Sequence, residues 1–368
     1  MTAAPLLAVA LNGICPYFTM FPLEFPRKIL YTYARKGQRV LDPFCGRGTT
    51  NFAARLLGLD SVGIDSSPVA AAITAAKLAV TDSEAVVNAA RRILEKPAKP
   101  SIPSGEFWDL AYRPEVLRAL CCLREAMLAD CSSPARRVLR AIVLGALHGP
   151  RAKGFPTYFS NQSTRTYAPK PRYAAKYWRN HRLLPPRVDV LNVIRRRAER
   201  YLAISLPSIK GSVVLGDSRN PQCIPAQSKD QKFDWIITSP PYYGMRTYVQ
   251  DQWLRNWFLG GPAEVDYGIQ GQLNHMSPSA FAAQLRTVWE NAAVACERGA
   301  RLVVRFGGIR DRRVDPLELI KVSLDGGRWR LQTVHNAGTA AFGKRQADAF
   351  LKARSKPMPE YDVWARLH

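Results

Sequence analysis

Two short segments contain residue types that could bind a nucleoside and hold a planar amine. In the first, residues 42–50 (DPFCGRGTT), two glycines follow a short apolar run. A glycine turn between a strand and a helix lets the backbone approach a ligand, and the helix N-terminus then faces its polar end. Asp65 ends the next apolar run, where a carboxylate can accept hydrogen bonds from a ribose diol. The spacing predicts a site for an adenosyl group; the alternative is a tight turn that binds nothing, with Asp65 as the N-cap of the following helix.

The second segment, residues 238–242 (TSPPY), directly follows the hydrophobic run 233–237. Two consecutive prolines remove two backbone donors and hold the chain in a fixed extended path. The Ser239 hydroxyl and the flat ring of Tyr242 flank this rigid stretch. Such a loop can hold a planar amine, although PPY alone is also typical of a turn that ends a strand.

Both segments need a sheet to position them. Apolar runs predict strands over residues 38–41, 61–64, 213–215, 233–238, 300–306, 329–334 and 361–367. Helical patterns over 49–57 and 67–80 separate the first strands and make a βαβ unit. The sequence therefore predicts an α/β fold with a parallel sheet and helices on its faces.

The charge of the chain favours a polyanionic partner. The 368 residues include 53 Lys and Arg but only 29 Asp and Glu, which gives a net charge of +24. Residues 151–200 hold 13 of the basic residues and 2 acidic ones, a net charge of +11. Nucleic acid is the commonest partner of such a folded basic chain, and solubility alone is the alternative.

Residues 82–211 separate the first two predicted strands from the others. Apolar spacing predicts helices over 113–128, 135–147 and 188–202, whereas the stretch 154–186 loses the helical period and becomes aromatic, basic and turn-rich. We therefore predict a catalytic domain of residues 1–81 and 212–368, interrupted by a mostly helical, basic insertion.

The insertion carries the side chains most suited to contact DNA phosphates and bases. The predicted contacts are Arg165, Lys170, Arg172, Lys176 and Arg179. A solvated surface loop is the alternative for this stretch, and residues 195–197 (RRR) can equally be the exposed face of a helix. Residues 260–278 or 309–327 could recognise the target instead.

The pairing of DPFCGRGTT with TSPPY closely resembles the S-adenosylmethionine-dependent DNA methyltransferases that modify exocyclic amino groups. The resemblance implies a Rossmann-like class I methyltransferase fold with a seven-stranded sheet. It also implies S-adenosyl-L-methionine as cofactor and double-stranded DNA as partner. Whether a cognate restriction endonuclease is a further partner stays open, as does the oligomeric state. The serine of TSPPY favours N4 of cytosine as the acceptor, with N6 of adenine as the alternative.

The resemblance also implies roles for individual residues. Asp42 would lie near the methionine amino group, Asp65 would hold the ribose hydroxyls, and Asp217 would hold the adenine amino group. The implied cofactor-binding set is Asp42, Phe44, Cys45, Gly46, Gly48, Thr49, Asp65 and Asp217. The implied catalytic set is Ser239, Pro240, Pro241 and Tyr242. Ser239 and the Pro240 carbonyl would accept hydrogen bonds from the target amine, and Tyr242 would stack on a base turned out of the duplex.

Two other functions stay open. Residues 240–246 (PPYYGMR) also resemble tRNA guanine-N2 methyltransferases, so RNA amino-methylation is one alternative. The other is a non-catalytic DNA-binding regulator with a degenerate methyltransferase fold. Neither a CxxC pair nor metal-like His spacing occurs in the sequence, so we expect no metal site. No apolar run reaches 18 residues, so we expect a cytoplasmic protein of a bacterial or archaeal cytosol or nucleoid.

Overall fold

The computed structural model forms two compact units. It describes residues 6–17, 21–149, 156–160, 170–225, 231–244, 252–265, 273, 277–308, 314–339 and 359–368. The sheet unit consists of residues 17–74, 207–247 and 270–368, and the helical unit consists of residues 1–16, 75–206 and 248–269. Residues 6–16 and 252–265 thus belong with most of the predicted insertion, although they lie far from it in sequence.

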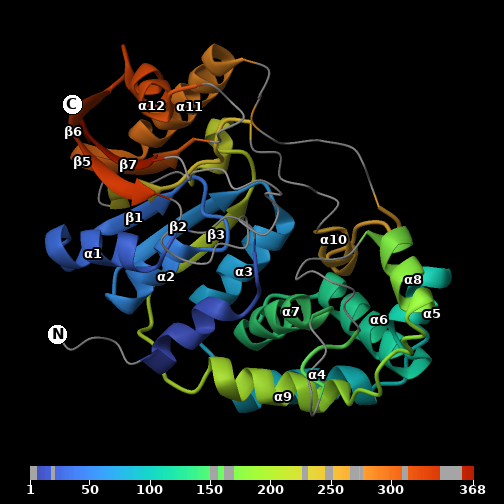
Figure 1. Ribbon diagram of the computed structural model, residues 1–368. Coiled ribbons are helices and arrows are strands. Elements are labelled where there is room, and N and C mark those ends of the chain that lie inside the picture. Colours follow the sequence, from blue (N-terminus) through green and yellow to red (C-terminus); the bar gives the residue numbers. More distant parts are fainter. Residues whose placement is uncertain are drawn as a thin grey trace. The chain divides into compact units, whose positions relative to one another are not determined.

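The sheet unit is built on one seven-stranded sheet (Figure 1). Its strands are β1 (Arg39–Asp42), β2 (Asp60–Asp65), β3 (Gly211–Leu215), β4 (Phe233–Thr238), β5 (Cys296–Gly307), β6 (Trp329–Thr339) and β7 (Pro359–Leu367). The order across the sheet is β3-β2-β1-β4-β5-β7-β6, and β7 runs antiparallel to both of its neighbours. Every predicted strand is present, and the predicted α/β, Rossmann-like class I methyltransferase fold is confirmed. The prediction of a parallel sheet is corrected, because antiparallel β7 makes the sheet mixed.

Helices cover the sheet because its central strands are apolar on both faces. Helix α1 (Glu24–Tyr33) packs against α2 (Thr49–Leu56), and α11 (Pro278–Val294) packs against α12 (Pro316–Leu324). The core beneath α11 and α12 joins strand residues such as Leu41 and Ile236 to Phe281 and Trp289 of α11. Helix α3 (Pro68–Leu78) begins in the sheet unit and ends in the helical unit.

The strand order reverses between β1 and β4. From β1 the chain proceeds outward to β2 and β3, and it then returns to place β4 on the other side of β1. Leu41 lies opposite Ile236 in the parallel register of this pair. Open α/β sheets bind ligands beyond the carboxyl ends of their strands at such a reversal. Both chemical segments, residues 42–50 and 238–242, leave the sheet at this point.

The helical unit is an assembly of short helices. They are the 3₁₀ helix η1 (Leu6–Gly13), α4 (Ser83–Glu95), α5 (Glu106–Ala111), α6 (Pro114–Ala129), α7 (Pro134–Ala146), α8 (Pro171–Asn180), α9 (Val190–Tyr201) and α10 (Trp253–Phe258). Helix α4 packs against α6, α7 and α9, while α5 packs against α8. The helices predicted over 113–128, 135–147 and 188–202 correspond to α6, α7 and α9.

Helix α8 corrects the prediction that residues 154–186 lack helical structure. Its buried side is only Ala174, Ala175 and Trp178, and the Trp178 ring centroid lies 5.5 Å from that of Phe107 on α5. The remaining positions are mostly basic or aromatic, so a ten-residue helix shows too few apolar positions for its period to be recognised. Residues 161–169 of the predicted stretch lie outside the described residues.

Candidate cofactor and target-base site

The two chemical segments are joined by a hydrogen bond between buried side chains. Thr238 Oγ1, at the end of β4, donates to Asp42 Oδ1, at the end of β1, over 2.6 Å. The backbone N–H of Phe44 donates to the same oxygen over 3.1 Å. Thr50 Oγ1 reaches back from α2 to the carbonyl of Ile237. The glycine segment and the proline segment therefore form one site, as the reversal between β1 and β4 requires.

The second carboxylate oxygen of Asp42 has the capacity to accept a further hydrogen bond. Asp42 is fully buried, and its Oδ2 has no hydrogen-bond partner among the described residues. Burial raises the pKa of Asp42 to about 7, although hydrogen bonds, with that of Thr238 the strongest, oppose the rise. Buried polar atoms are rarely left without a partner. An ammonium group placed at Oδ2 would supply one and would favour the ionised carboxylate.

Asp65 fixes the glycine turn. Its Oδ2 accepts a hydrogen bond from the Gly46 N–H over 2.8 Å, and its Oδ1 accepts one from the Ser67 N–H over 2.9 Å. Burial raises the pKa of Asp65 despite these two hydrogen bonds. The helix that follows is capped by Ser67, whose hydroxyl accepts from the Ala70 N–H, so the alternative of Asp65 as the N-cap is wrong. Each Asp65 oxygen retains a lone pair that a ribose hydroxyl could use.

The two glycines of the turn have different surroundings. Both have positive φ, +51° at Gly46 and +71° at Gly48. A Cβ on Gly46 would meet no atom within 4 Å, whereas a Cβ on Gly48 would lie 2.6 Å from Thr74 Oγ1. Thr74 Oγ1 in turn donates to the Gly46 carbonyl over 3.0 Å. Gly48 is thus needed for packing as well as for its backbone conformation, and Gly46 borders open space.

The other implied cofactor residues around this turn are largely buried. Cys45 is buried, with its Sγ 3.7 Å from Thr74 Oγ1, and Thr49 is buried as the first residue of α2. Phe44 meets Trp289 of α11 edge-on, with ring centroids 6.1 Å apart. These contacts fix the turn from α3 and from α11.

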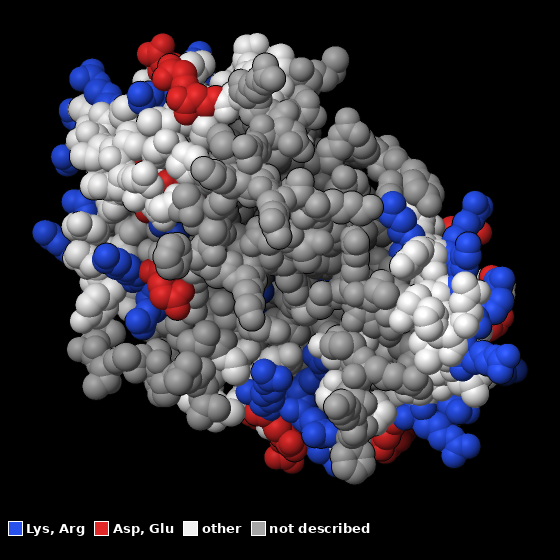
Figure 2. All heavy atoms as spheres, in the orientation of Figure 1, with Lys and Arg blue, Asp and Glu red and all other residues white. Residues whose placement is uncertain are grey.

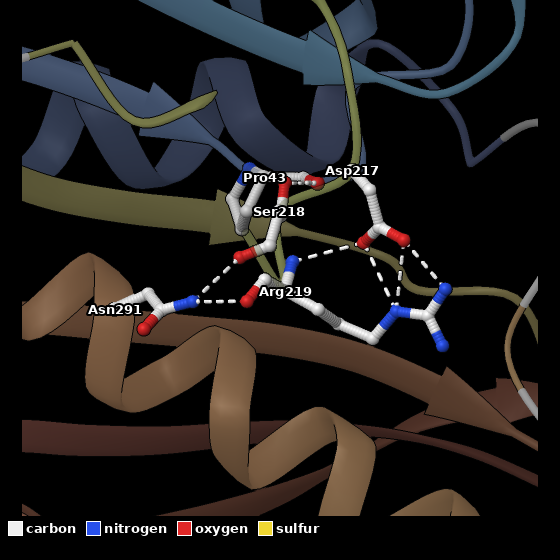
Figure 3. Close-up of polar contacts among 5 residues, drawn as sticks. All are labelled: Pro43, Asp217, Ser218, Arg219 and Asn291. Atoms are coloured by element: carbon white, nitrogen blue, oxygen red, sulfur yellow. Dashed lines mark hydrogen bonds and ion pairs between the residues drawn. The ribbon is translucent and has the colours of Figure 1, made fainter. Parts of the chain in front are cut away.

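Asp217 lies in a loop that several polar contacts hold in place (Figure 3). Its carboxylate accepts hydrogen bonds from the backbone N–H and the guanidinium of Arg219. Partial burial alone would raise the pKa of Asp217, but the hydrogen bonds and charge of Arg219 lower it below its ordinary value. Ser218 Oγ donates to the Pro43 carbonyl over 2.7 Å, and Asn291 Nδ2 of α11 donates to the carbonyls of Ser218 and Arg219. The loop after β3 is thereby attached to the turn after β1.

Sequence reasoning missed Ser218, Arg219 and Asn291. Ser218 and Arg219 directly follow Asp217, but nothing in the sequence marks their partners. Asn291 directly precedes the small apolar residues 292–294 (AAV) at the end of α11, and a polar residue beside this apolar run was the available signal. Its partners lie 72 and 73 residues away along the chain.

The proline segment presents one half-buried hydroxyl and one restrained ring. Ser239 is half-buried, Pro240 is buried and Pro241 is exposed. The Tyr242 hydroxyl lies 2.5 Å from Oε1 of Glu360 at the start of β7. Glu360 was also missed, because it lies 118 residues beyond Tyr242 and one residue before the predicted strand 361–367.

The residues predicted to contact DNA lie on or next to α8 in the helical unit. Lys170, Arg172 and Lys176 are exposed, while Arg179 forms an ion pair with Glu106 of α5. Arg165 lies outside the described residues. Figure 2 shows Lys and Arg outnumbering Asp and Glu on the described surface in this view.

The interpretation of residues 195–197 as an exposed face is wrong for Arg197. Its guanidinium donates two hydrogen bonds to the Thr157 carbonyl and lies 4.6 Å from the centre of the Tyr158 ring. Arg197 therefore anchors the short segment 156–160 to α9. Among the alternative recognition segments, residues 266–272, 274–276 and 309–313 lie outside the described residues, and α12 occupies 316–324.

One family model and one curated protein match part of the chain. Residues 11–76 match the DNA methylase family. The match includes the glycine turn and Asp65 and ends before the proline segment. A 34-residue stretch is 53% identical to the type II methyltransferase M.BsoBI of Geobacillus stearothermophilus, and it covers 9% of this chain and 7% of that protein. Together these matches support a DNA methyltransferase and do not distinguish cytosine N4 from adenine N6.

Solved structures similar to this chain include methyltransferases and a [4+2]-cyclase, all of low sequence identity. The rRNA methyltransferase aviRa of Streptomyces viridochromogenes is 14% identical, with a TM-score of 0.36 over 99% of this chain and 94% of its own. A SAM-dependent methyltransferase of Methanosarcina mazei is 10% identical, with a TM-score of 0.35 over 95% and 99%. Similarity at this level says nothing about the activity of the chain. Among the described residues, no helix has the length and apolar character needed to cross a membrane.

Proposed function

We propose that this protein is a site-specific DNA methyltransferase that transfers a methyl group from S-adenosyl-L-methionine to the exocyclic N4 of cytosine in double-stranded DNA. The observation that carries the proposal is the hydrogen bond from Thr238 to Asp42. This bond brings the glycine turn and the proline segment to one point of the sheet. Adenine N6 is the alternative acceptor.

The residues of the glycine turn fit the proposed cofactor. Asp42 Oδ2 is a buried acceptor without a partner among the described residues, as the methionine ammonium would require. Open space beside Gly46 leaves room for the methionine moiety, and Asp65 and Asp217 would hold the ribose and the adenine. When bound, S-adenosylmethionine supplies an electrophilic sulfonium methyl group.

The residues of the proline segment would prepare the acceptor amine. The lone pair of an aromatic amine is delocalised into its ring, so the amine is a weak nucleophile until its N–H groups are held by fixed acceptors. The Ser239 hydroxyl oxygen and the Pro240 carbonyl are such acceptors, and Tyr242 offers a surface on which the base can stack. Orientation of this kind supplies much of the rate enhancement in group transfer.

Reaching the amine requires the base to leave the duplex, so the DNA must be held while one base rotates out. The exposed residues Lys170, Arg172 and Lys176 of the α8 region would contact phosphates. The proposal also includes action in a bacterial or archaeal cytosol or nucleoid, and a cognate restriction endonuclease as a further partner.

Transfer of radiolabel from S-adenosylmethionine to genomic DNA tests the proposal. The wild type should label DNA, and Ser239→Ala and Tyr242→Ala should each lose most of this activity. Tyr31→Ala, which removes a tyrosine that is 57% exposed on α1, is the matched control and should label DNA as the wild type does. Label on RNA alone would overturn the proposal, and tight DNA binding without label would favour a regulator. Chromatography of nucleosides from the labelled DNA then separates N4-methylcytosine from N6-methyladenine.

A further inference from the structure

The ring of Tyr242 is restrained from three sides. Its hydroxyl lies 2.5 Å from Glu360 Oε1, and its ring meets the Phe306 ring edge-on at a centroid distance of 5.3 Å. Gly307 of β5 lies opposite Glu360 of β7 in the sheet register. A Cβ on Gly307 would lie 2.9 Å from Glu360 Cγ and 3.1 Å from the Tyr242 ring, so glycine allows both groups to approach.

Glu360 is an unusual residue to find here. Its side chain is 3% exposed, and buried carboxylates are costly unless strong hydrogen bonds compensate them. A hydroxyl bound to a carboxylate makes one of the shorter and stronger hydrogen bonds in proteins. Because the tyrosine carries the hydroxyl at the far end of its ring, the bond fixes the direction in which the ring points.

We propose that Glu360 is a positioning residue that fixes the direction of the Tyr242 ring before a target base arrives. The inference rests on the proposed function, because it assigns Glu360 to the step in which the extruded base stacks on Tyr242. A ring already held in place loses little freedom when the base stacks on it, so more of the stacking energy serves binding of the flipped base. Glu360 acts on the target base through Tyr242, and cofactor binding at the glycine turn does not depend on it.

Four variants test this inference: Glu360→Ala, Glu360→Gln, Tyr242→Phe, and the double variant Tyr242→Phe/Glu360→Ala. Glu360→Ala and Tyr242→Phe should each lower kcat on DNA by roughly ten- to hundredfold, the loss expected when a reacting group is misplaced. The double variant should lose no more than the worse single variant, because both changes remove the same hydrogen bond. Glu360→Gln keeps an acceptor of the same shape and should recover most of the activity. The dissociation constant for S-adenosylmethionine should stay unchanged in all four.

A structural readout accompanies the kinetics, because Glu360→Ala removes an acceptor from the hydroxyl of the half-buried Tyr242. Urea unfolding of the same four proteins measures the coupling between the two residues without any DNA. Glu318→Gln, which changes an exposed glutamate of α12, should leave both kcat and the unfolding midpoint as in the wild type.

The outcomes separate this inference from the proposed function. Losses in kcat that add in the double variant, or Glu360→Gln as inactive as Glu360→Ala, would overturn the inference while the wild type still labels DNA. A weaker affinity of Glu360→Ala for S-adenosylmethionine would also overturn the inference, since it would indicate general damage to the site. If the wild type itself labels no DNA, the proposed function fails, and the positioning role of Glu360 fails with it.

Discussion

At the scale of single residues, the protonation of Asp42 links the fold to the proposed cofactor. Its carboxyl group is buried between two strand ends, and burial raises its pKa to about 7. A raised pKa means that the folded protein holds this proton at pH values where the unfolded chain has lost it. The stability that this raised pKa contributes is therefore fully present below about pH 4, and it is lost as the pH rises through about 7.

The same pKa predicts how cofactor affinity depends on pH. A methionine ammonium at Oδ2 favours the ionised carboxylate, so affinity should rise with pH and level off above about 7. Because one proton with this pKa must be lost, the affinity for the cofactor should be about tenfold higher at pH 8 than at pH 6. Isothermal titration calorimetry checks this, with Asp42→Asn as the control for titration of the ligand itself. Equal pH dependence in the variant and the wild type would show that Asp42 does not face the ammonium.

The glycine turn gives a second prediction at this scale. Alanine at Gly46 meets only the strain of positive φ, a cost of about 1–2 kcal/mol. Alanine at Gly48 adds a clash with Thr74, and overpacking costs about 1–3 kcal/mol more. Urea unfolding should therefore show a larger loss of stability for Gly48→Ala than for Gly46→Ala. Equal losses would contradict the packing assigned to Thr74.

At the scale of elements, the outer strands of the sheet carry a row of like charges. Arg301 of β5 lies opposite Arg366 of β7, which lies opposite Arg330 of β6, and all three are exposed. Farther along the same strands the charges are opposite, because Arg305 of β5 forms an ion pair with Asp362 of β7. Like charges directly opposite on adjacent strands destabilise a sheet.

Neutralising the middle of this row should stabilise the protein. Arg366→Gln is expected to raise the free energy of unfolding by up to about 1 kcal/mol at low ionic strength. The gain should shrink in 1 M salt, where exposed charges are screened. Arg305→Gln, which breaks the ion pair with Asp362, is the matched control and should lower stability instead. Urea unfolding at two salt concentrations measures both variants, and destabilisation by Arg366→Gln would refute the repulsion.

At the scale of the whole molecule, the net charge of +24 is divided between two units with different proposed roles. The sheet unit contains the proposed cofactor and target-base residues. The helical unit contains α8, with Lys170, Arg172 and Lys176 exposed. Basic residues that contact phosphates make binding depend on salt, because each contact releases counterions.

Removing the three charges should therefore flatten the salt dependence of DNA binding. Lys170→Gln/Arg172→Gln/Lys176→Gln should reduce the slope of log K against log salt by about 0.9 for each lost phosphate contact. Affinity for S-adenosylmethionine should not change. The charge-matched control replaces Arg92, Lys96 and Lys99, which are exposed elsewhere in the helical unit. Fluorescence anisotropy with a labelled duplex gives both slopes, and equal slopes for the two triple variants would contradict a specific role for α8.

The sequence by itself determined the sheet and its two chemical segments. Strand periods, the glycine turn and the double proline are local patterns, so each predicted strand and the position of residues 42–50 and 238–242 at strand ends could be inferred. The contact of Asp65 with the glycine turn and the capping role of Ser67 could not be inferred, because both depend on the path of the chain after β2.

Only the tertiary structure decided which distant residues meet at the site. Glu360 reaches Tyr242 across 118 residues, and Asn291 holds the loop after Asp217, because β7 and α11 pack where the strand order places them. Helix α8 could not be predicted for a related reason. It has few apolar side chains, and they form a buried face only because the helix packs against α5. Such contacts follow from strand order and helix packing, which leave no period or spacing in the sequence.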